Sequence, residues 1–186
     1  MPNRSNKFQH FSALDLVRRP VDDQACGTFR DDLDNFESVF DRATTVGIAF
    51  LRDIAACRLV RSYLREEKLD LAEKYLGERF ETVGLDVPSM DPIRIGARAE
   101  IRAARGEDQR ADFLFREALR LFGSLGDGYN HADTRRVYAR FLIARGRAGE
   151  AREHVDWLLR YYAEPIAVRQ RLVAEELMRE IEAASG

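Results

Sequence analysis

The sequence contains only two cysteines, Cys26 and Cys57, and no Cys-x-x-Cys spacing. A disulfide framework or a structural zinc site needs more cysteines or histidines at convergent positions, so the sequence predicts neither. The nearest approach to a metal-binding pair is His131 with Asp133, and two ligands at the start of one predicted helix do not converge on an ion. We therefore expect no metal, no other cofactor and no catalytic residues.

Long apolar runs are also missing. No segment approaches the ~20 apolar residues of a membrane span, and the first residues do not resemble a signal peptide. A formal net charge of -2 and an isoelectric point near 6.0 argue against a surface built for nucleic acid. We therefore expect a cytoplasmic protein that contacts neither membranes nor nucleic acid directly.

Lysine is scarce, because only Lys7, Lys68 and Lys74 contribute to the 30 basic residues. The basic chemistry therefore rests on arginine, whose planar guanidinium binds carboxylates through two parallel hydrogen bonds. A GC-rich genome would produce the same skew and is the simpler explanation.

What the sequence does contain is an internal repeat. With 45% hydrophobic and 33% charged residues, its 186 residues have the composition of one folded domain. Gly106 and Gly146 are 40 residues apart, and the alanines five residues after them, Ala111 and Ala151, have the same spacing.

An earlier and weaker copy of this pattern precedes the two clear ones. Ala72 lies 39 residues before Ala111, with Glu67 at the position of the glycine. Near-constant spacing of this length is typical of stacked helical hairpins, in which each hairpin buries its apolar face against the next.

Apolar residues within each copy recur with the spacing of amphipathic helices. We predict an all-α chain of about nine helices in a single domain, 1–186. The segment Leu85–Pro92, which contains two prolines, is interpreted as a joint between two halves of the array. The predicted parts are a frayed start at 1–6, an N-terminal helical pair at 7–47, repeat hairpins at 48–84, 92–124 and 129–163, and a capping helix at 165–184.

Small residues occupy one position of the helix before each repeat turn, namely Val60, Ala99 and Ala139. With these residues and the turn glycines, the chain resembles tetratricopeptide repeats (TPRs) of the long, about 40-residue kind. That resemblance implies antiparallel helical hairpins stacked as a right-handed solenoid.

A second resemblance concerns the stretch around Leu33-Asp34-Asn35-Phe36 and the helices after it. They look like the start of the C-terminal repeat region of STAND-type bacterial transcription regulators. The Gly-Lys-Ser/Thr phosphate loop and the helix-turn-helix of such regulators are not found in this sequence. The resemblance therefore implies either a detached repeat domain or a free-standing relative.

Arginines recur on the predicted first helices of the hairpins, at intervals of three and four residues that place them on shared helix faces. In TPRs the first helices line the concave groove, so the resemblance implies a groove whose guanidinium groups bind carboxylates of a partner. The candidate groove residues are Arg58, Arg61, Arg65, Arg98, Arg102, Arg136 and Arg140.

The alternative is a solvated face whose arginines pair with neighbouring acidic residues, as charge runs on helices usually do. Strict repeat register would bury Arg98 and Arg102. Either a lined pocket with acidic partners holds them, or, as we favour, the helix is rotated to keep them out of the core. In the solvated-face alternative, the acidic partners of the arginines are Glu66, Glu100, Glu107 or Asp133. The residues that rotation would turn inward are Ile93, Ala97, Ile101 and Ala104.

Trp157, Tyr161 and Tyr162 form an aromatic cluster near the last predicted hairpin. Such clusters usually belong to the core, whereas exposure of Trp157 would indicate a contact surface.

These patterns favour a non-enzymatic scaffold or adaptor that binds a protein or peptide, acidic in character, in a regulatory role. One alternative is a sensor domain that binds a small anionic effector within a STAND-type regulator. Another is a structural subunit that forms homodimers through its open apolar end.

Overall fold

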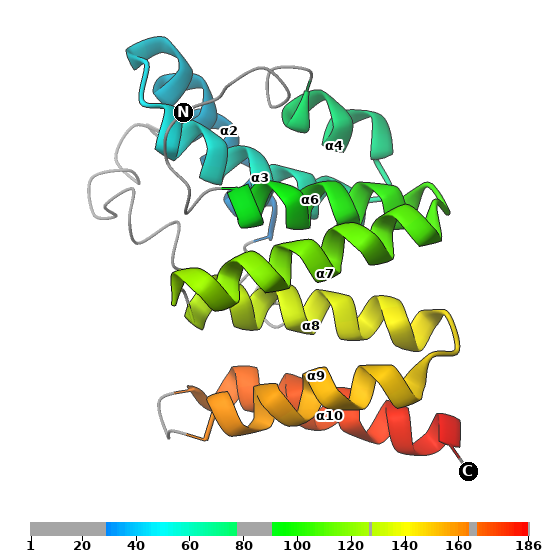
Figure 1. The fold of residues 1–186 in the computed structure, drawn as a ribbon. Helices are drawn as coiled ribbons and strands as arrows, with labels where there is room; N and C mark the ends of the chain where they lie inside the picture. Colours follow the sequence, from blue (N-terminus) through cyan, green and yellow to red (C-terminus); the bar gives the residue numbers. More distant parts are fainter. Residues whose placement is uncertain (1–28, 78–90, 127, 164–166, 186) are drawn as a thin grey trace. The chain divides into compact units, whose positions relative to one another are not determined.

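The computed structural model describes residues 29–77, 91–126, 128–163 and 167–185, and all regular secondary structure in these ranges is helical (Figure 1). Contacts along the chain divide it into two compact units, Met1–Met90 and Asp91–Gly186. The eight described α-helices are α2 (Phe29–Val46), α3 (Ala49–Arg65), α4 (Leu69–Leu76), α6 (Asp91–Ala104), α7 (Asp108–Leu125), α8 (Gly128–Ala144), α9 (Ala148–Tyr161) and α10 (Val168–Ser185).

In the first unit, α3 packs against both α2 and α4. Leu59 and Val60 of α3 are completely buried, as expected for the apolar face of a central helix. A carboxylate joins the three helices, because Glu37 of α2 accepts hydrogen bonds from the hydroxyls of Tyr63 of α3 and Tyr75 of α4. Burial, reinforced by Glu37, raises the pKa of both tyrosines and keeps them protonated as donors.

In the second unit, each helix from α6 to α10 packs against the next one in sequence. Helix α8 also contacts α6 and α10, so these three alternate helices neighbour one another. One apolar core runs through all five helices, with Ala99 of α6, Phe115 of α7, Leu142 of α8, Val155 of α9 and Leu177 of α10 among its members. The core of this unit is therefore built from its own helices.

The same turn closes all three helical pairs of the repeat. Glu67, Gly106 and Gly146 each adopt a left-handed backbone conformation, with φ of 57°, 74° and 71°. The residue after each one donates a hydrogen bond to a carbonyl five residues earlier, at 2.9, 2.9 and 2.8 Å. This is the Schellman arrangement that ends a helix, and it recurs at 39- and 40-residue spacing.

The described helices agree closely with those expected from the sequence. Helices α2 and α3 and the four helices of the hairpins 92–124 and 129–163 lie where they were predicted, with ends shifted by a few residues. The predicted helix within 7–19 and the end of the hairpin 48–84 lie outside the described residues. The all-α prediction is confirmed for the described ranges, while the count of nine stays a prediction.

The boundary between the two units falls between Met90 and Asp91, the first residue of α6. The joint interpreted from Leu85–Pro92 lies largely outside the described residues and stays a prediction. Among the described helices, none is long and apolar enough to cross a bilayer.

Candidate functional site

The seven predicted groove arginines lie on three helices in two units. Arg58, Arg61 and Arg65 belong to α3 of the first unit, where Arg58 is buried and Arg65 exposed. The remaining four belong to α6 and α8, which contact each other in the second unit. The structure therefore places one subset, consisting of Arg98, Arg102, Arg136 and Arg140, on two contacting helices of one unit.

Two arginines of this subset are paired with carboxylates of their own chain. Arg102 Nη1 donates to both carboxylate oxygens of Glu107, at 2.9 and 3.2 Å. Arg136 is buried, with 6% exposure, and its Nη2 donates to Asp133 Oδ1 at 2.8 Å. Both residues show the expected pairing with a neighbouring carboxylate, but Arg136 is buried and does not lie on a solvated face.

Arg98 and Arg140 differ from each other in exposure. Arg140 is exposed on α8, while Arg98 is half-buried on α6 and makes no hydrogen bond or ion pair with any residue that the structure describes. The predicted rotation of α6 about its axis accounts for the position of Arg98, because Ala97 and Ile101 are buried instead of it. Ala104 is exposed and Ile93 only half-buried, so the predicted inward face is correct at two of its four positions.

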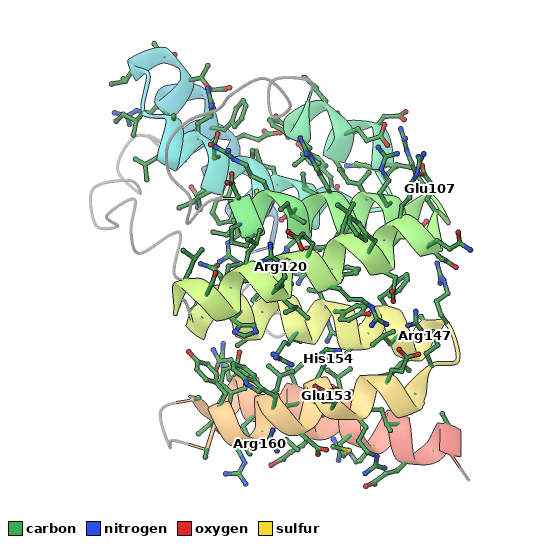
Figure 2. The ribbon with its side chains drawn as sticks, viewed as in Figure 1. Glu107, Arg120, Arg147, Glu153, His154 and Arg160 are labelled. Carbon is green, nitrogen blue, oxygen red and sulfur yellow. The ribbon has the colours of Figure 1, made fainter. Side chains whose placement is uncertain are left out.

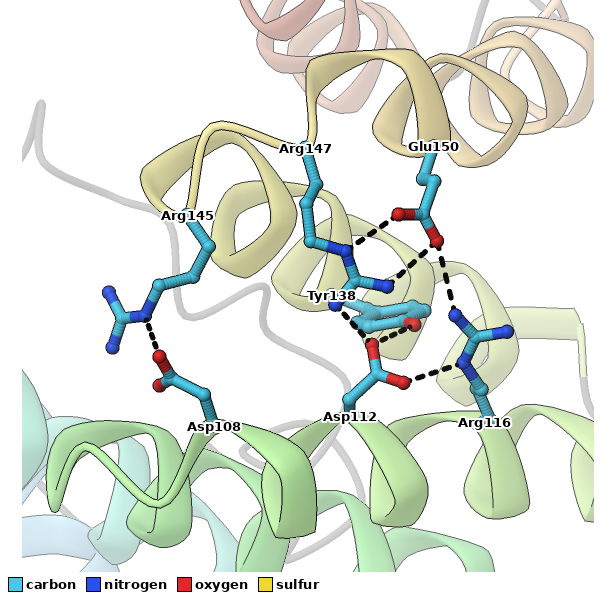
Figure 3. A network of polar contacts seen from close by, with 7 residues as sticks. All are labelled: Asp108, Asp112, Arg116, Tyr138, Arg145, Arg147 and Glu150. Atoms are coloured by element: carbon cyan, nitrogen blue, oxygen red, sulfur yellow. Dashed lines mark hydrogen bonds and ion pairs between the residues drawn. The ribbon is translucent and has the colours of Figure 1, made fainter.

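A polar network that the sequence did not indicate joins α7, α8 and α9 (Figure 3). Its centre is Asp112 of α7, whose Oδ1 accepts from the Tyr138 hydroxyl at 2.8 Å and from Arg147 Nη1 at 2.6 Å. Its Oδ2 accepts from Arg116 Nε at 2.7 Å. Glu150 of α9 bridges the two guanidinium groups, at 3.1 Å to Arg116 and 2.6 Å to Arg147.

The ionisation of this network matches its geometry. Burial alone would raise the pKa of Asp112, but the hydrogen bonds from Tyr138, Arg147 and Arg116 outweigh it and leave the pKa below its usual value. Burial and the hydrogen bond to Asp112 raise the pKa of Tyr138 to about 12, so the phenol remains a donor. Because every charge has a partner, we assign the network to the packing of neighbouring hairpins rather than to ligand binding.

A second cluster between α8 and α9 is built differently. Arg135 Nε donates to His131 Nε2 at 3.1 Å, and Arg135 Nη1 lies 3.1 Å from His154 Nδ1. Since a guanidinium group only donates, the His154 nitrogen must accept, and both imidazoles act through lone pairs. Figure 2 shows His154 pointing from α9 toward α8. Arg135 therefore donates to neutral acceptors, whereas the helix α7 and α8 residues Arg110, Arg116, Arg120 and Arg136 donate to carboxylates.

Aromatic rings enclose this arginine. The guanidinium carbon of Arg135 lies 4.7 Å from the centroid of the Trp157 ring, in cation–π geometry. Trp157 also stacks on Tyr161 at 4.9 Å, and Tyr161 meets Tyr162 edge to face at 5.1 Å. Trp157 is half-buried and Tyr161 is 41% exposed, so the predicted aromatic cluster belongs partly to the core and partly to the surface.

The surroundings of the cluster disfavour extra positive charge. Burial, followed by the charge of Arg135, lowers the pKa of His154 to about 4, which keeps this ring neutral near pH 7. Burial also lowers the pKa of Arg135, an effect that Arg160 reinforces and Glu153 opposes. The cluster thus holds one guanidinium charge in a partly desolvated, aromatic setting.

Sequence reasoning missed both Arg135 and His154. The only local signal is the four-residue spacing of His131 and Arg135, which places them on one helix face. His154 and Trp157 come from the next helix, so their approach depends on how two helices pack. No group of three or more histidine, cysteine or acidic side chains among the described residues could hold a metal ion.

These features define a chain whose described part is all-helical and whose Asp91–Gly186 unit consists of sequential, antiparallel helices (Figure 1). No protein-family model, curated protein or solved structure matches the sequence.

Proposed function

We propose that this chain is a right-handed, TPR-like solenoid that acts as a non-enzymatic binding module for an acidic protein or peptide segment. The observation that carries the proposal is the repeated turn. Three left-handed turns with the same hydrogen bonds, at Glu67, Gly106 and Gly146, close three successive helical pairs. Recurrence of one supersecondary unit is what a stacked helical-repeat protein requires.

The contacts of the second unit agree with this proposal. Helix α8 lies against α6 and α10 as well as against α7 and α9, as the first helix of a hairpin does in such an array. Arg98 of α6 and Arg140 of α8 then belong to the row of first helices that faces a ligand in the proposed solenoid. The resemblance to regulator repeat regions makes a regulatory adaptor role the specific form of the proposal.

A fluorescently labelled peptide rich in glutamate, and its glutamine-substituted copy, test the binding role. We expect the full chain to bind the acidic peptide and not the neutral one. Guanidinium groups form charge-assisted, paired hydrogen bonds with a carboxylate, and a neutral amide does not replace these bonds. In the Arg98→Gln/Arg140→Gln variant, the affinity should fall about tenfold or more, as expected for lost hydrogen bonds to charged groups.

The matched control removes two exposed arginines elsewhere, in the Arg152→Gln/Arg179→Gln variant, and changes the net charge equally. It should bind nearly as well as the unmodified chain. Equal losses in both variants would mean that net charge alone governs binding, and the groove assignment would then be wrong. Adding Arg61→Gln and Arg65→Gln shows whether α3 of the first unit contributes.

One observation favours a second candidate, a subunit that self-associates. Val168 and Leu172 of α10 lie four residues apart on the same helix face and are 58% and 56% exposed. Sedimentation velocity of the unmodified chain and of a Val168→Ser/Leu172→Ser variant tests this candidate. A dimer that dissociates only in the variant would support it, whereas a monomer at every concentration would remove it.

A further inference from the structure

Arg135 donates hydrogen bonds to two histidines, whereas many arginines of the second unit pair with carboxylates. Arginines of this unit that pair with its carboxylates are Arg94, Arg102, Arg105, Arg110, Arg116, Arg120, Arg136, Arg145, Arg147 and Arg171. Arg135 instead uses Nε and Nη1 on two imidazoles, and it forms no ion pair with any described residue. Its charge therefore lies in a half-buried position with no carboxylate of the described residues in direct contact.

The guanidinium group still has hydrogen-bonding capacity. Its third nitrogen, Nη2, makes no hydrogen bond within the described part of the chain. Nη1 carries a second hydrogen besides the one directed at His154. The edge formed by Nη1 and Nη2 is the one that accepts a carboxylate through two parallel hydrogen bonds.

The electrostatic setting favours an anion at this edge. Partial burial makes an uncompensated charge costly, and Trp157 and Phe122 line the cluster with apolar rings. The neighbouring Arg160 adds positive charge, while Glu153 opposes it from an exposed position on α9. Figure 2 shows the Arg160 side chain pointing away from α8, so it adds to the field without closing the cluster.

We propose that Arg135, oriented by His131 and His154 and backed by Trp157, is a binding site for a single carboxylate group. One guanidinium charge matches one carboxylate charge, and the two imidazoles hold the guanidinium plane in place before the ligand arrives. The carboxylate belongs either to a small organic acid or to an acidic side chain of a peptide.

The site is separate from the groove of the proposed function. Arg135 and Arg140 are five residues apart on α8, which places them about 140° apart around the helix axis. Loss of one site would therefore leave the other intact, and the two proposals succeed or fail independently.

The chain contains its own reporter, because Trp157 is the only tryptophan. A carboxylate that binds Arg135 alters the charge and the ring environment 4.7 Å from this indole. The experiment titrates the full chain at pH 7.5 with sodium acetate and records Trp157 emission, against sodium chloride at equal ionic strength. We expect a saturable change with acetate and none with chloride.

Two variants assign the signal. Arg135→Gln should weaken acetate binding about tenfold or more, and Arg135→Lys, which keeps the charge but lacks the planar edge, should also weaken it. Arg179→Gln, which removes an exposed arginine of α10 outside both proposed sites, should bind acetate as the unmodified chain does. Circular dichroism of each variant verifies that its helices are intact. An emission change that follows ionic strength alone, or that persists unchanged in both Arg135 variants, would overturn the proposal.

A third titration distinguishes the two sources of the carboxylate. An N-acetylated, C-amidated tripeptide with a central glutamate presents the same group within a peptide. Tighter binding of the tripeptide than of acetate, lost in Arg135→Gln, assigns the site to a peptide side chain. Equal or weaker binding, also dependent on Arg135, assigns it to a small organic acid.

Discussion

Asp112 concentrates much of the polar contact between hairpins in one side chain. It accepts three hydrogen bonds from residues of α7, α8 and the turn before α9, and two of the donors are charged. Hydrogen bonds to charged groups contribute more than neutral ones, at about 1.5–3 kcal/mol each when a partner is removed. A single carboxylate therefore ties together parts of the chain that are distant in sequence.

We expect Asp112→Asn to lower the free energy of unfolding by about 2 kcal/mol at pH 7, because the amide keeps the shape but loses the charge. Urea unfolding followed by circular dichroism measures it. The folded pKa of Asp112 is depressed, so its contribution is present above the unfolded value of about 3.9 and is lost as pH falls through the folded value. The difference between variant and unmodified chain should accordingly shrink in acid.

The control is Glu117→Gln, which removes an exposed ion pair with Arg120 within α7. Its midpoint in urea should stay nearly unchanged, because exposed pairs within one helix contribute little. A larger effect from Glu117→Gln than from Asp112→Asn would contradict the central role of Asp112.

Because of His154, the free energy of unfolding is expected to decrease as the pH falls below neutral. Its folded pKa is about 4, because burial and then the charge of Arg135 lower it, while an unfolded histidine titrates near 6.5. Below about pH 6.5 the unfolded chain binds a proton that the folded chain does not, so stability falls as pH decreases toward 4. After allowance for partial exposure, this loss is about 2 kcal/mol.

We expect the His154→Gln variant to lose less stability than the unmodified chain between pH 7 and pH 4.5. Glutamine can still accept a hydrogen bond from Arg135 but does not titrate. Urea midpoints at several pH values measure the difference. Parallel pH curves for the two proteins would show that His154 is not the titrating group.

At the scale of elements, substitutions in the three repeat turns measure the effect of backbone conformation on stability without a change in packing. Gly106 and Gly146 have positive φ, and a Cβ added to either would meet nothing within 4 Å. Substitution by alanine should therefore destabilise the chain through backbone strain alone, by about 1 kcal/mol. Glu67 holds the same conformation without being glycine, so Glu67→Gly should stabilise by about 0.5–1 kcal/mol.

Thermal unfolding of the three single variants measures these effects. The matched control is Gly123→Ala within α7, where a Cβ also meets nothing within 4 Å and φ is not positive. Alanine is the better helix former, so this substitution should stabilise by about 0.5–1 kcal/mol. Opposite signs for Gly106→Ala and Gly123→Ala are the expected signature, and equal signs would rule out the strain argument.

The helices themselves were largely predictable from local sequence. Apolar spacing located α6 to α9, and the glycine turns located their ends, because helical periodicity and left-handed turn residues act over a few residues. The interpretation of the arginines was less successful. The alternative interpretation named Glu107 and Asp133 among the acidic partners, and both pairs are found, but spacing did not show that Arg136 is buried.

At the scale of the whole molecule, the second unit contains a complete core. The buried cluster that includes Phe115, Leu142 and Leu177 draws only on helices α6 to α10. A unit that buries its apolar face against its own elements can fold alone.

We therefore expect the fragment 91–186, expressed separately, to keep its helical circular dichroism and to unfold cooperatively on heating. The Leu177→Ala form of the fragment provides the control, because removal of this buried side chain should lower stability by about 2–4 kcal/mol. A fragment that lacks helical signal, or that melts without a cooperative transition, would show that residues before Asp91 are needed for this core.

Helix content, repeat length and turn positions follow from short-range preferences, and the sequence was sufficient to predict them. Which charges meet was decided by tertiary packing. Arg135 reaches His154 and Trp157, 19 and 22 residues further along the chain, only because α8 and α9 pack with one particular rotation and offset. Helical periodicity gives the face on which a side chain lies, but not the neighbour that it finds across the interface.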